Sequence, residues 1–234
     1  MADDSPAPDA RAPDAIVRVE DLAFTYRSGD FRLDVGDLSI ARGATTALIG
    51  PSGSGKTTFL NLVAGIFLPE RGTVSVDGTE VSAATDAARR AFRVANIGLV
   101  FQEFELLDYL SVLDNVLLPF RIAPTLSLTR EVRDRAAKLA RRVGLGDKLA
   151  RSVRRLSQGE RQRVGVCRAL VTEPTLVMAD EPTGNLDPDT RARVLDTLFE
   201  FAAGTDATLL TVTHDHDLLD RFDETIDVTD WRAP

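Results

Sequence analysis

The segment Gly50-Pro-Ser-Gly-Ser-Gly-Lys-Thr57 constrains this chain more than any other, because it is a complete G-x-x-x-x-G-K-[ST] pattern. It follows the apolar run 44–49, which is typical of a strand, and precedes 58–64, which is typical of a helix. Glycines tolerate the backbone angles of a concave loop whose N–H groups surround phosphate oxygens. A glycine-rich turn can match this pattern by chance, but strand, loop and helix in this order favour a nucleoside triphosphate site.

Within this loop, Lys56 is placed to reach the β- and γ-phosphates, and Thr57 to offer its hydroxyl to Mg²⁺. The dipole of the helix that follows favours the same anion. ATP and Mg²⁺ are therefore the expected ligands. The residues predicted to bind the phosphates are Gly50, Pro51, Ser52, Gly53, Ser54, Gly55, Lys56, Thr57 and Thr58.

A second chemical element is the pair Asp180-Glu181, which ends an apolar, strand-like run over 176–179. Ligands of open α/β folds bind at the carboxyl ends of parallel strands. Asp180 is therefore a candidate ligand of Mg²⁺ beside Thr57, and Glu181 a candidate for activating the attacking water. Two adjacent acidic residues also occur in ordinary surface turns, and it is the loop upstream that favours the catalytic interpretation.

Composition limits the class of protein. With 234 residues, 44% of them hydrophobic, the chain is long enough for one domain, or for one domain with an added lobe. It has no apolar run of the roughly 20 residues that span a bilayer and no signal pattern, so we expect it in the cytoplasm. A net charge of -8 argues against broad attachment to nucleic acid or anionic lipid. The short basic run 151–155 is interpreted as solvated surface.

The first 14 residues differ in composition from the strand-like segments that follow them. Residues 1–14 are rich in Pro, Ala and Asp, and we predict a disordered tail before one domain over 15–234. Alternating patterns predict short strands at 16–20, 22–26, 31–35 and 38–40. A hairpin is predicted over 72–81, with Asp77-Gly78 at its turn.

Farther along, helices and strands alternate as a parallel sheet requires. Buried strands are predicted at 97–101, 175–179 and 207–212, and helices dominate about 103–170. Ser111 has the spacing of a helix cap, a helix over 132–143 is expected to end at Gly144, and another is opened by Asp187-Pro188. The single cysteine, Cys167, cannot form an internal disulfide, and we expect a buried thiol rather than a redox centre.

The segment Leu156-Ser-Gln-Gly-Glu160 lies just ahead of the strand that carries Asp180, and it closely resembles the signature motif of ATP-binding cassette (ABC) proteins. Simple P-loop GTPases and kinases lack this motif. The resemblance covers nearly all of 16–230, with every motif in the expected order. It implies an α/β fold: a P-loop core of RecA type with an antiparallel β subdomain and an α-helical subdomain over about 103–170.

The same resemblance assigns roles to residues outside the loop. Tyr26 looks like the aromatic residue that stacks on adenine, although a buried strand tyrosine is an alternative. Gln102 resembles the residue that contacts Mg²⁺ or water, and His214 the histidine that contacts the γ-phosphate. The His-x-His spacing with His216 is not interpreted as a metal site.

In that family two chains share each ATP, so an ATP-dependent homodimer is implied. Ser157 and Gly159 would face ATP on the partner chain, and Asp187 would lie at the interface. The chain departs from the usual signature at two places: Gln158 replaces the first glycine, and Glu160 replaces the final glutamine. Gly159 keeps close backbone approach to phosphate available, and we predict that ATP is hydrolysed, with Glu181, His214 and Lys56 as the catalytic residues.

Within the family, Asp180-Glu-Pro-Thr-Gly-Asn-Leu-Asp187 looks most like the LolD, MacB and FtsE group. Members of that group work with separate membrane permeases, which would receive mechanical work. The chain would then meet the membrane only through transmembrane permease subunits at its inner face and would not bind nucleic acid. Candidates for a groove that receives a permease helix are Phe101, Phe104, Leu106, Leu107 and Tyr109. Two alternatives remain open: a soluble ABC ATPase acting on nucleic acid or ribosomes, and the ATPase of a solute importer.

Overall fold

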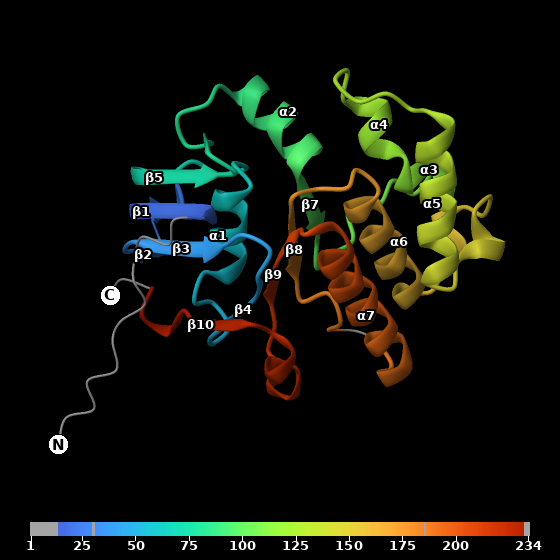
Figure 1. The fold of residues 1–234 in the computed structure, drawn as a ribbon. Helices are drawn as coiled ribbons and strands as arrows, with labels where there is room; N and C mark the ends of the chain where they lie inside the picture. Colours follow the sequence, from blue (N-terminus) through green and yellow to red (C-terminus); the bar gives the residue numbers. More distant parts are fainter. Residues whose placement is uncertain (1–13, 30, 185, 232–234) are drawn as a thin grey trace.

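Two five-stranded sheets organise the molecule (Figure 1), whose computed structural model describes residues 14–29, 31–184 and 186–231. The antiparallel sheet has the order β2-β1-β5-β6, with β3 also paired to β1. Its strands are β1 (Ala15–Thr25), β2 (Arg32–Val35), β3 (Leu38–Ala41), β5 (Arg71–Val76) and β6 (Thr79–Glu80). The parallel sheet has the order β10-β4-β9-β8-β7. Its strands are β4 (Thr45–Ile49), β7 (Ile97–Val100), β8 (Leu176–Asp180), β9 (Thr208–Val212) and β10 (Glu224–Asp227).

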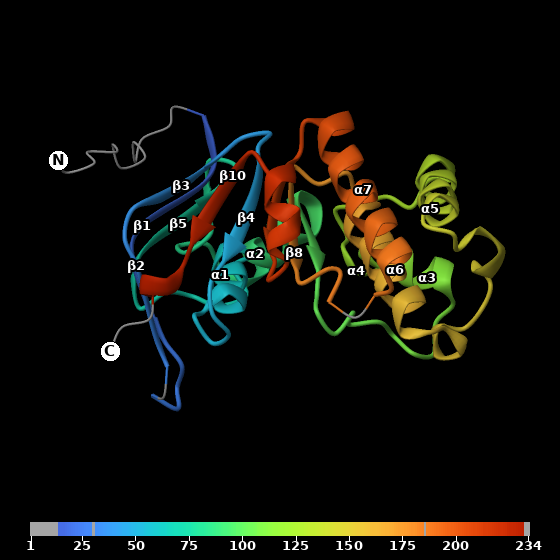
Figure 2. The same ribbon diagram turned by 90° about the horizontal axis from the view of Figure 1, so that it is seen from below.

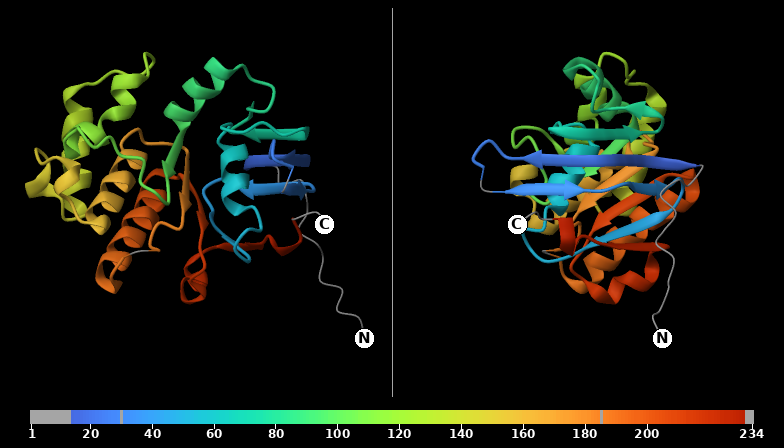
Figure 3. Two further views of the ribbon diagram at one scale, coloured as in Figure 1. Left: turned by 180° about the vertical axis from the view of Figure 1, so that it is seen from behind. Right: turned by 90° about the vertical axis from the view of Figure 1, so that its left-hand side faces the viewer.

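The helices take distinct places around these sheets. They are α1 (Lys56–Val63), α2 (Asp86–Asn96), α3 (Val112–Val116), α4 (Leu118–Ile122), α5 (Arg130–Arg142), α6 (Gln158–Leu170) and α7 (Pro188–Thr205). Short 3₁₀ turns cover Gly146–Lys148, Val153–Arg155, His216–Arg221 and Thr229–Trp231. Helices α3 to α7 lie on the side of the parallel sheet that faces away from the antiparallel sheet (Figures 1 and 2). The views from behind and from the side show the same division (Figure 3).

Strand β8 separates two hydrophobic cores, and all five of its residues are buried. Successive side chains of a strand point to opposite faces. Accordingly, Leu176 and Met178 pack in the core that holds α1 and the antiparallel sheet, whereas Val177 and Ala179 pack against α6 and α7. A third core joins α3, α5 and α6 and includes the buried Cys167, as predicted. The predicted α/β class with its antiparallel sheet and helical part is confirmed.

The first strand differs from its prediction. Two strands were expected at 16–20 and 22–26, but β1 runs through both segments. The predicted gap between the two strands, at residue 21, is a local distortion within one continuous strand. Asp21 has a φ of 44°, and the pairing of β1 with β5 shifts register between Glu20 and Ala23. Gly72 fits against this distortion, because a Cβ there would lie 2.3 Å from the carbonyl oxygens of Glu20 and Asp21.

Other predicted elements agree within a few residues. The hairpin turns at Asp77-Gly78, both with positive φ, and Thr129 and Asp187 cap α5 and α7. Two elements were not foreseen: α2, which has no buried residue, and the edge strand β10, whose alternate residues are exposed. Of the predicted tail over 1–14, only Asp14 is among the described residues, and it pairs with Arg42. The proposed domain boundaries remain a prediction.

Candidate functional site

A cavity of about 420 Å³ opens where the parallel strands end. It collects segments that follow β4, β7, β8 and β9, the edge of an α/β sheet at which ligands bind. Most of the residues predicted from the sequence line it together. The lining residues are Tyr26, Phe31, Ser52, Gly53, Gly55, Lys56, Thr57, Thr58, Gln102, Glu181, Val212 and His214.

The loop over 50–57 has a shape that requires glycine. Gly50, Gly53 and Gly55 have φ values of 150°, 78° and 102°, in the range that side-chain-bearing residues rarely adopt. A Cβ on Gly55 would also lie 2.6 Å from Leu33 Cδ1. The loop therefore lies directly against the antiparallel sheet, and its path depends on these glycines.

Lys56 is held inside the loop. Its Nζ donates to the carbonyl oxygens of Gly50 and Pro51, each at 2.8 Å, and only 6% of the residue is exposed. Burial lowers the pKa of its ammonium group, and the charges of Glu181 and Asp180 act in the opposite direction. The structure thus keeps a buried cation next to two carboxylates.

Helix α1 begins at Lys56 without a side-chain cap, because its N-cap residue is Gly55. The first N–H groups of a helix have no partner within the helix, and together with the dipole they favour an anion. The N-terminus of α1 meets the cavity through Lys56, Thr57 and Thr58. A triphosphate fits this arrangement, because it would supply the oxygens that these donors lack.

Asp180 ends β8 and is 7% exposed. Burial raises the pKa of its carboxyl group, while a hydrogen bond from Thr57 lowers it. The pair resembles the usual partial shell of Mg²⁺, in which protein oxygens hold the ion and phosphates and water complete its coordination. Within the described residues no cluster of three His, Cys, Asp or Glu side chains could hold a metal.

Glu181 and His214 contact each other at the rim of the cavity. Nε2 of His214 lies 2.7 Å from Oε1 of Glu181. Glu181 also has a φ of 47°, an uncommon conformation for a residue other than glycine, and its N–H donates to the Val212 oxygen. Strained residues of this kind persist where the surroundings fix them, frequently at functional sites.

The far end of the cavity is aromatic. The hydroxyl groups of Tyr26 and Thr58 are 3.0 Å apart and share a hydrogen bond, and Tyr26, which directly follows β1, is 36% exposed rather than buried. Phe31 also lines the cavity, with its ring centroid 5.8 Å from that of Tyr26. Phe31 was not among the predicted site residues, although an aromatic residue just before β2, the strand that returns after Tyr26, was a signal for it.

Seven predicted residues do not line this cavity. Gly50, Pro51 and Ser54 belong to the loop and Asp180 to the end of β8, whereas the other three lie elsewhere. Ser157 caps α6, Gly159 lies in the first turn of α6, and Asp187 caps α7. They form a region of their own: a Cβ on Gly159 would lie 3.0 Å from Leu186 Cδ2 and 4.0 Å from Thr190 Cγ2. We call this the α6 start region, defined by Ser157, Gly159 and Asp187.

The two departures from the usual signature have local explanations. Gln158 is exposed in the first turn of α6 without a positive φ, so this position needs no glycine. Glu160 completes a capping box: Ser157 Oγ accepts from the Glu160 N–H, and the Glu160 carboxylate accepts from the Ser157 N–H at 2.8 Å. Glu160 also pairs with Lys148, which lowers the pKa of its carboxyl group.

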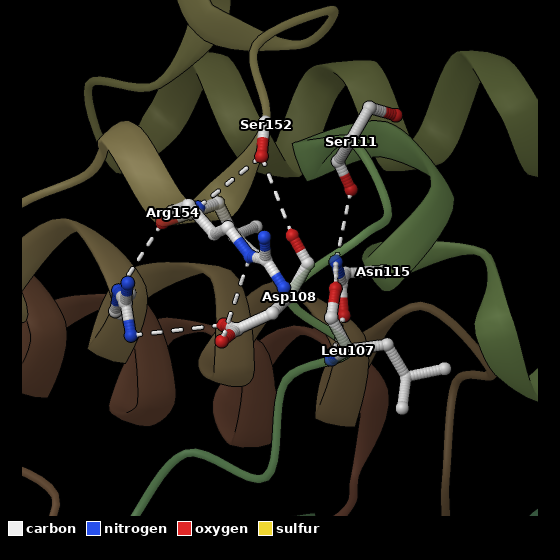
Figure 4. A network of polar contacts seen from close by, with 8 residues as sticks. Leu107, Asp108, Ser111, Asn115, Ser152 and Arg154 are labelled. Carbon is white, nitrogen blue, oxygen red and sulfur yellow. Dashed lines mark hydrogen bonds and ion pairs between the residues drawn. The ribbon is translucent and has the colours of Figure 1, made fainter.

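A polar network fixes the loop after Gln102 to helix α3 (Figure 4). The buried Asn115 side chain accepts from the Leu107 N–H at 2.8 Å and donates to the oxygens of Leu107 and Ser111, at 3.1 and 3.0 Å. All three partners are backbone groups. The Asn115 side chain therefore satisfies loop N–H and C=O groups that a helix or strand would otherwise pair.

The same loop is tied to the segment that leads into α6. Ser152 Oγ donates to the Asp108 carbonyl oxygen at 3.3 Å, and the Asp108 carboxylate lies 3.8 Å from Arg154 and from Arg161 (Figure 4). Gln102 lines the cavity. The loop that follows it is therefore held to the segment before α6, through Ser152 and Arg154, and to Arg161 of α6 itself.

A glycine-shaped loop, a buried lysine, an uncapped helix and strand-end carboxylates at the edge of a parallel sheet define a P-loop nucleoside triphosphatase. The family model described as ABC transporter matches residues 33–184, more than half of the chain. The chain belongs to the ABC transporter family and is an ABC ATPase of the ATP-binding subunit type. No helix in the described ranges is long and apolar enough to cross a membrane.

Known relatives agree with this assignment. The chain is 39% identical over 217 residues to the lipoprotein-releasing system ATP-binding protein LolD of Xanthomonas oryzae, covering 92% of this chain and 88% of that protein. It is also 39% identical over 220 residues to an uncharacterised ABC transporter ATP-binding protein of Mycobacterium tuberculosis, with coverage of 93% and 88%. Among solved structures, it resembles a dimeric ATP-binding cassette, MJ0796, in a post-hydrolysis state bound to ADP and Pi, with a TM-score of 0.82, 29% identity and coverage of 92% and 94%.

Proposed function

We propose that two copies of this chain close on ATP and separate after hydrolysis, and that this cycle drives a separate permease of the kind used in lipoprotein release, efflux or mechanical signalling. The named function of LolD supports the first of these. The protein would then work at the inner face of the cell membrane, with the permease as its only attachment.

The residues of the cavity divide the work within one copy. The loop N–H groups and Lys56 bind the phosphates, and Thr57, Asp180 and Gln102 would hold Mg²⁺. Mg²⁺ supplies charge neutralisation to the phosphate oxygens when bound. Glu181 accepts a proton from the attacking water, and His214, already in contact with Glu181, orients that carboxylate and faces the γ-phosphate. Tyr26 stacks on adenine.

One observation supports the proposed dimer. The cavity is lined by Lys56, Glu181 and His214 but not by Ser157 or Gly159. Ser157 is exposed at the start of α6, where a helix N-terminus favours an anion. In a two-fold dimer, the exposed start of α6 in each chain would face the cavity of the other chain. Asp187 would lie at the same interface.

The Glu181→Gln variant tests this proposal. Without the base it should bind ATP and remain as a dimer, so size-exclusion chromatography should show a dimer with ATP and a monomer with ADP, and phosphate release should fall by about 100-fold or more. The control is the double variant Lys56→Ala, Glu181→Gln, which should stay monomeric. Unchanged phosphate release in Glu181→Gln would show that Glu181 is not the base.

The permease would dock on the surface between α2, α4 and α6, where a cavity of about 230 Å³ opens. Of the five groove residues proposed from the sequence, Phe101 lines this cavity, Leu106 packs in the helical core, and Tyr109 is 75% exposed. Phe104 and Leu107 contribute backbone groups to hydrogen bonds with Arg168 and Asn115.

A further inference from the structure

Glu181 and His214 line two cavities at once. One is the nucleotide cavity, and the other has a volume of about 480 Å³ and is lined largely by polar side chains. Arg191 and Asp215 belong to this other cavity and form an ion pair there. The two residues proposed to act on the attacking water therefore lie next to a charged pair that does not line the nucleotide cavity.

The position of His214 depends on its neighbours along the chain. It lies between the end of β9 and the 3₁₀ turn His216–Arg221, outside regular secondary structure. On one side, the buried Thr213 donates its N–H to the Leu48 carbonyl oxygen at 3.2 Å. On the other side, the Asp215 N–H donates to Oγ1 of Thr213 at 3.1 Å. The residues that flank His214 are thus tied to each other, and whatever fixes Asp215 also fixes the histidine.

The Asp215 carboxylate makes two contacts. Its Oδ1 accepts from the Asp217 N–H at 3.2 Å and caps the 3₁₀ turn, and its Oδ2 accepts from Nη1 of Arg191 at 2.7 Å. The side chains of Arg191 and Asp215 are 39% and 25% exposed, so water and salt screen this pair less than a fully exposed one. In the described part of the chain, Asp215 is the one residue that pairs with the Arg191 guanidinium, whose buried Nε has no partner there.

Helix α7 gives Arg191 a fixed base. The Arg191 N–H donates to the Asp187 carbonyl oxygen at 2.8 Å, in the first turn of this helix. Val194 and Leu198, farther along α7, are fully buried in the core that also holds Val177 of β8. Side chains on packed helices are held more precisely than side chains on loops. The ion pair therefore attaches the loop of His214 to a rigid element.

We propose that Arg191 is a positioning residue for ATP hydrolysis: through its ion pair with Asp215, it fixes the loop that carries His214 and keeps that ring against Glu181. This inference rests on the proposed function, because it takes Glu181 and His214 as residues that act in hydrolysis. It adds a residue that lies outside the loop 50–57, the signature 156–160 and the segment 180–187.

Steady-state kinetics of phosphate release test the proposal on the full chain. Arg191→Gln and Asp215→Asn should each lower kcat by about 10- to 100-fold, because a small misplacement of a catalytic group is costly, and should leave KM for ATP within about twofold. Asparagine keeps an oxygen for the Asp217 N–H, so the second change removes the ion pair but not the cap. The double variant should be no slower than the slower single variant. Effects that multiply would mean that the two residues act separately.

Arg191→Lys is the conservative variant. A lysine can still make the single contact that Nη1 of Arg191 makes with Asp215, so kcat should return to within about threefold of that of the unaltered protein. A kcat as low as that of Arg191→Gln would mean that the charge of the pair does not matter, and the inference would be wrong.

A second ion pair supplies a matched control. Nη2 of Arg221 lies 2.8 Å from Oδ1 of Asp196, and this contact joins α7 to the far end of the same 3₁₀ turn. Asp196→Asn breaks this pair but not the one beside His214, so kcat should stay within about twofold. Melting curves by circular dichroism check that each variant is folded at the assay temperature. An equal loss of kcat in Asp196→Asn and Arg191→Gln would show that both pairs serve only the fold.

The His214 ring can also be observed directly, because the chain has only two histidines. In a His216→Gln background, the remaining imidazole gives one set of ring signals in nuclear magnetic resonance spectra. Without nucleotide, Arg191→Gln should shift or broaden the Cε1–H signal of His214, whereas Asp196→Asn should leave it unchanged. An unchanged signal in Arg191→Gln would overturn the inference.

The two proposals fail separately. If Glu181→Gln releases phosphate at an unchanged rate, the proposed function is wrong, whatever the His214 signal shows. If Glu181→Gln is inactive but Arg191→Gln keeps its full kcat, only the positioning role of Arg191 is wrong.

Discussion

The nucleotide cavity and the α6 start region are built on opposite principles. The buried Lys56 and the uncapped start of α1 line the cavity, and the buried Asp180 ends the strand beside it. At the start of α6, Ser157 and Glu160 satisfy each other in a capping box, and Lys148 neutralises Glu160. The first region needs a ligand to complete it, whereas the second is complete without one and presents an exposed surface.

This difference indicates how the labour of ATP hydrolysis is divided. A site assembled from one chain would bring both regions around the same cavity. Here Gly159 lies against Leu186 and Thr190 instead, and none of the α6 start residues lines the cavity. The comparison therefore predicts that the cavity acts within its own chain and the α6 start region acts on the partner.

The largest expected effect comes from disabling each region in turn. Lys56→Ala removes the buried ammonium that we propose binds the phosphates, and ATPase activity should fall by about 100- to 1,000-fold. Ser157→Arg should abolish activity as well, because it places a large cation at the surface that we propose meets the partner. Steady-state phosphate release measures both, and Lys138→Ala, on α5 outside the cavity, serves as the control.

Mixing these two inactive variants distinguishes action on the partner from action within one chain. A two-fold dimer of one Lys56→Ala chain and one Ser157→Arg chain has one site with both changes and one with neither. In an equal mixture with random pairing, about half of the dimers are mixed, so on the order of a quarter of all sites carry neither change. Activity should therefore return to roughly a quarter of that of the unaltered protein. An inactive mixture that still contains mixed dimers would mean that both regions serve the same chain.

The next effect concerns the contact between β7, the strand that precedes Gln102, and the C-terminal end of α6. Gly98 of β7 packs against α6, where a Cβ would lie 2.4 Å from the Ala169 carbonyl oxygen and 2.9 Å from Pro174 Cγ. Gly98→Ala should lower the free energy of unfolding by about 3 kcal/mol, because backbone must move to admit the methyl group. Urea unfolding measures the loss.

Gly204→Ala is the matched control. Gly204 lies in α7 without a positive φ, and a Cβ there would have no other atom within 4 Å. Alanine is the better helix former, so this change should raise the free energy of unfolding by up to about 1 kcal/mol. Equal destabilisation by both variants would mean that close packing at Gly98 does not join β7 to α6.

The smallest effect tests the charge of the α6 start region. Because Lys148 holds the pKa of Glu160 below its ordinary value of 4.5, the pair stabilises the folded chain above that value, and the stabilisation disappears as pH falls through the lower folded pKa. Glu160→Gln should keep the cap but lose the ion pair, at about 1 kcal/mol or less near pH 7. Urea unfolding of both proteins should converge as pH falls below 4.5. A constant difference at every pH would exclude the ion pair as its cause.

Much of the fold and of the cavity was predictable because the relevant signals are local. The strand before Gly50 and the hairpin at Asp77-Gly78 follow from apolar runs and turn residues. Elements without such signals were missed: α2 buries none of its residues, and β10 is an edge strand with alternate residues exposed. The continuity of β1 through Asp21 depends on its pairing with β3 in one half and β2 in the other, which no local pattern contains.

By itself, the sequence determined the chemical groups and their order: a glycine loop that ends in Lys56, a strand that ends in Asp180-Glu181, and a capped helix that begins at Ser157. These depend on backbone preferences and short-range hydrogen bonds, which act between neighbours along the chain. Only the tertiary structure decided which groups meet. It placed Phe31 beside Tyr26, joined His214 to Glu181, and kept Ser157 away from the cavity, because these outcomes depend on packing between distant segments.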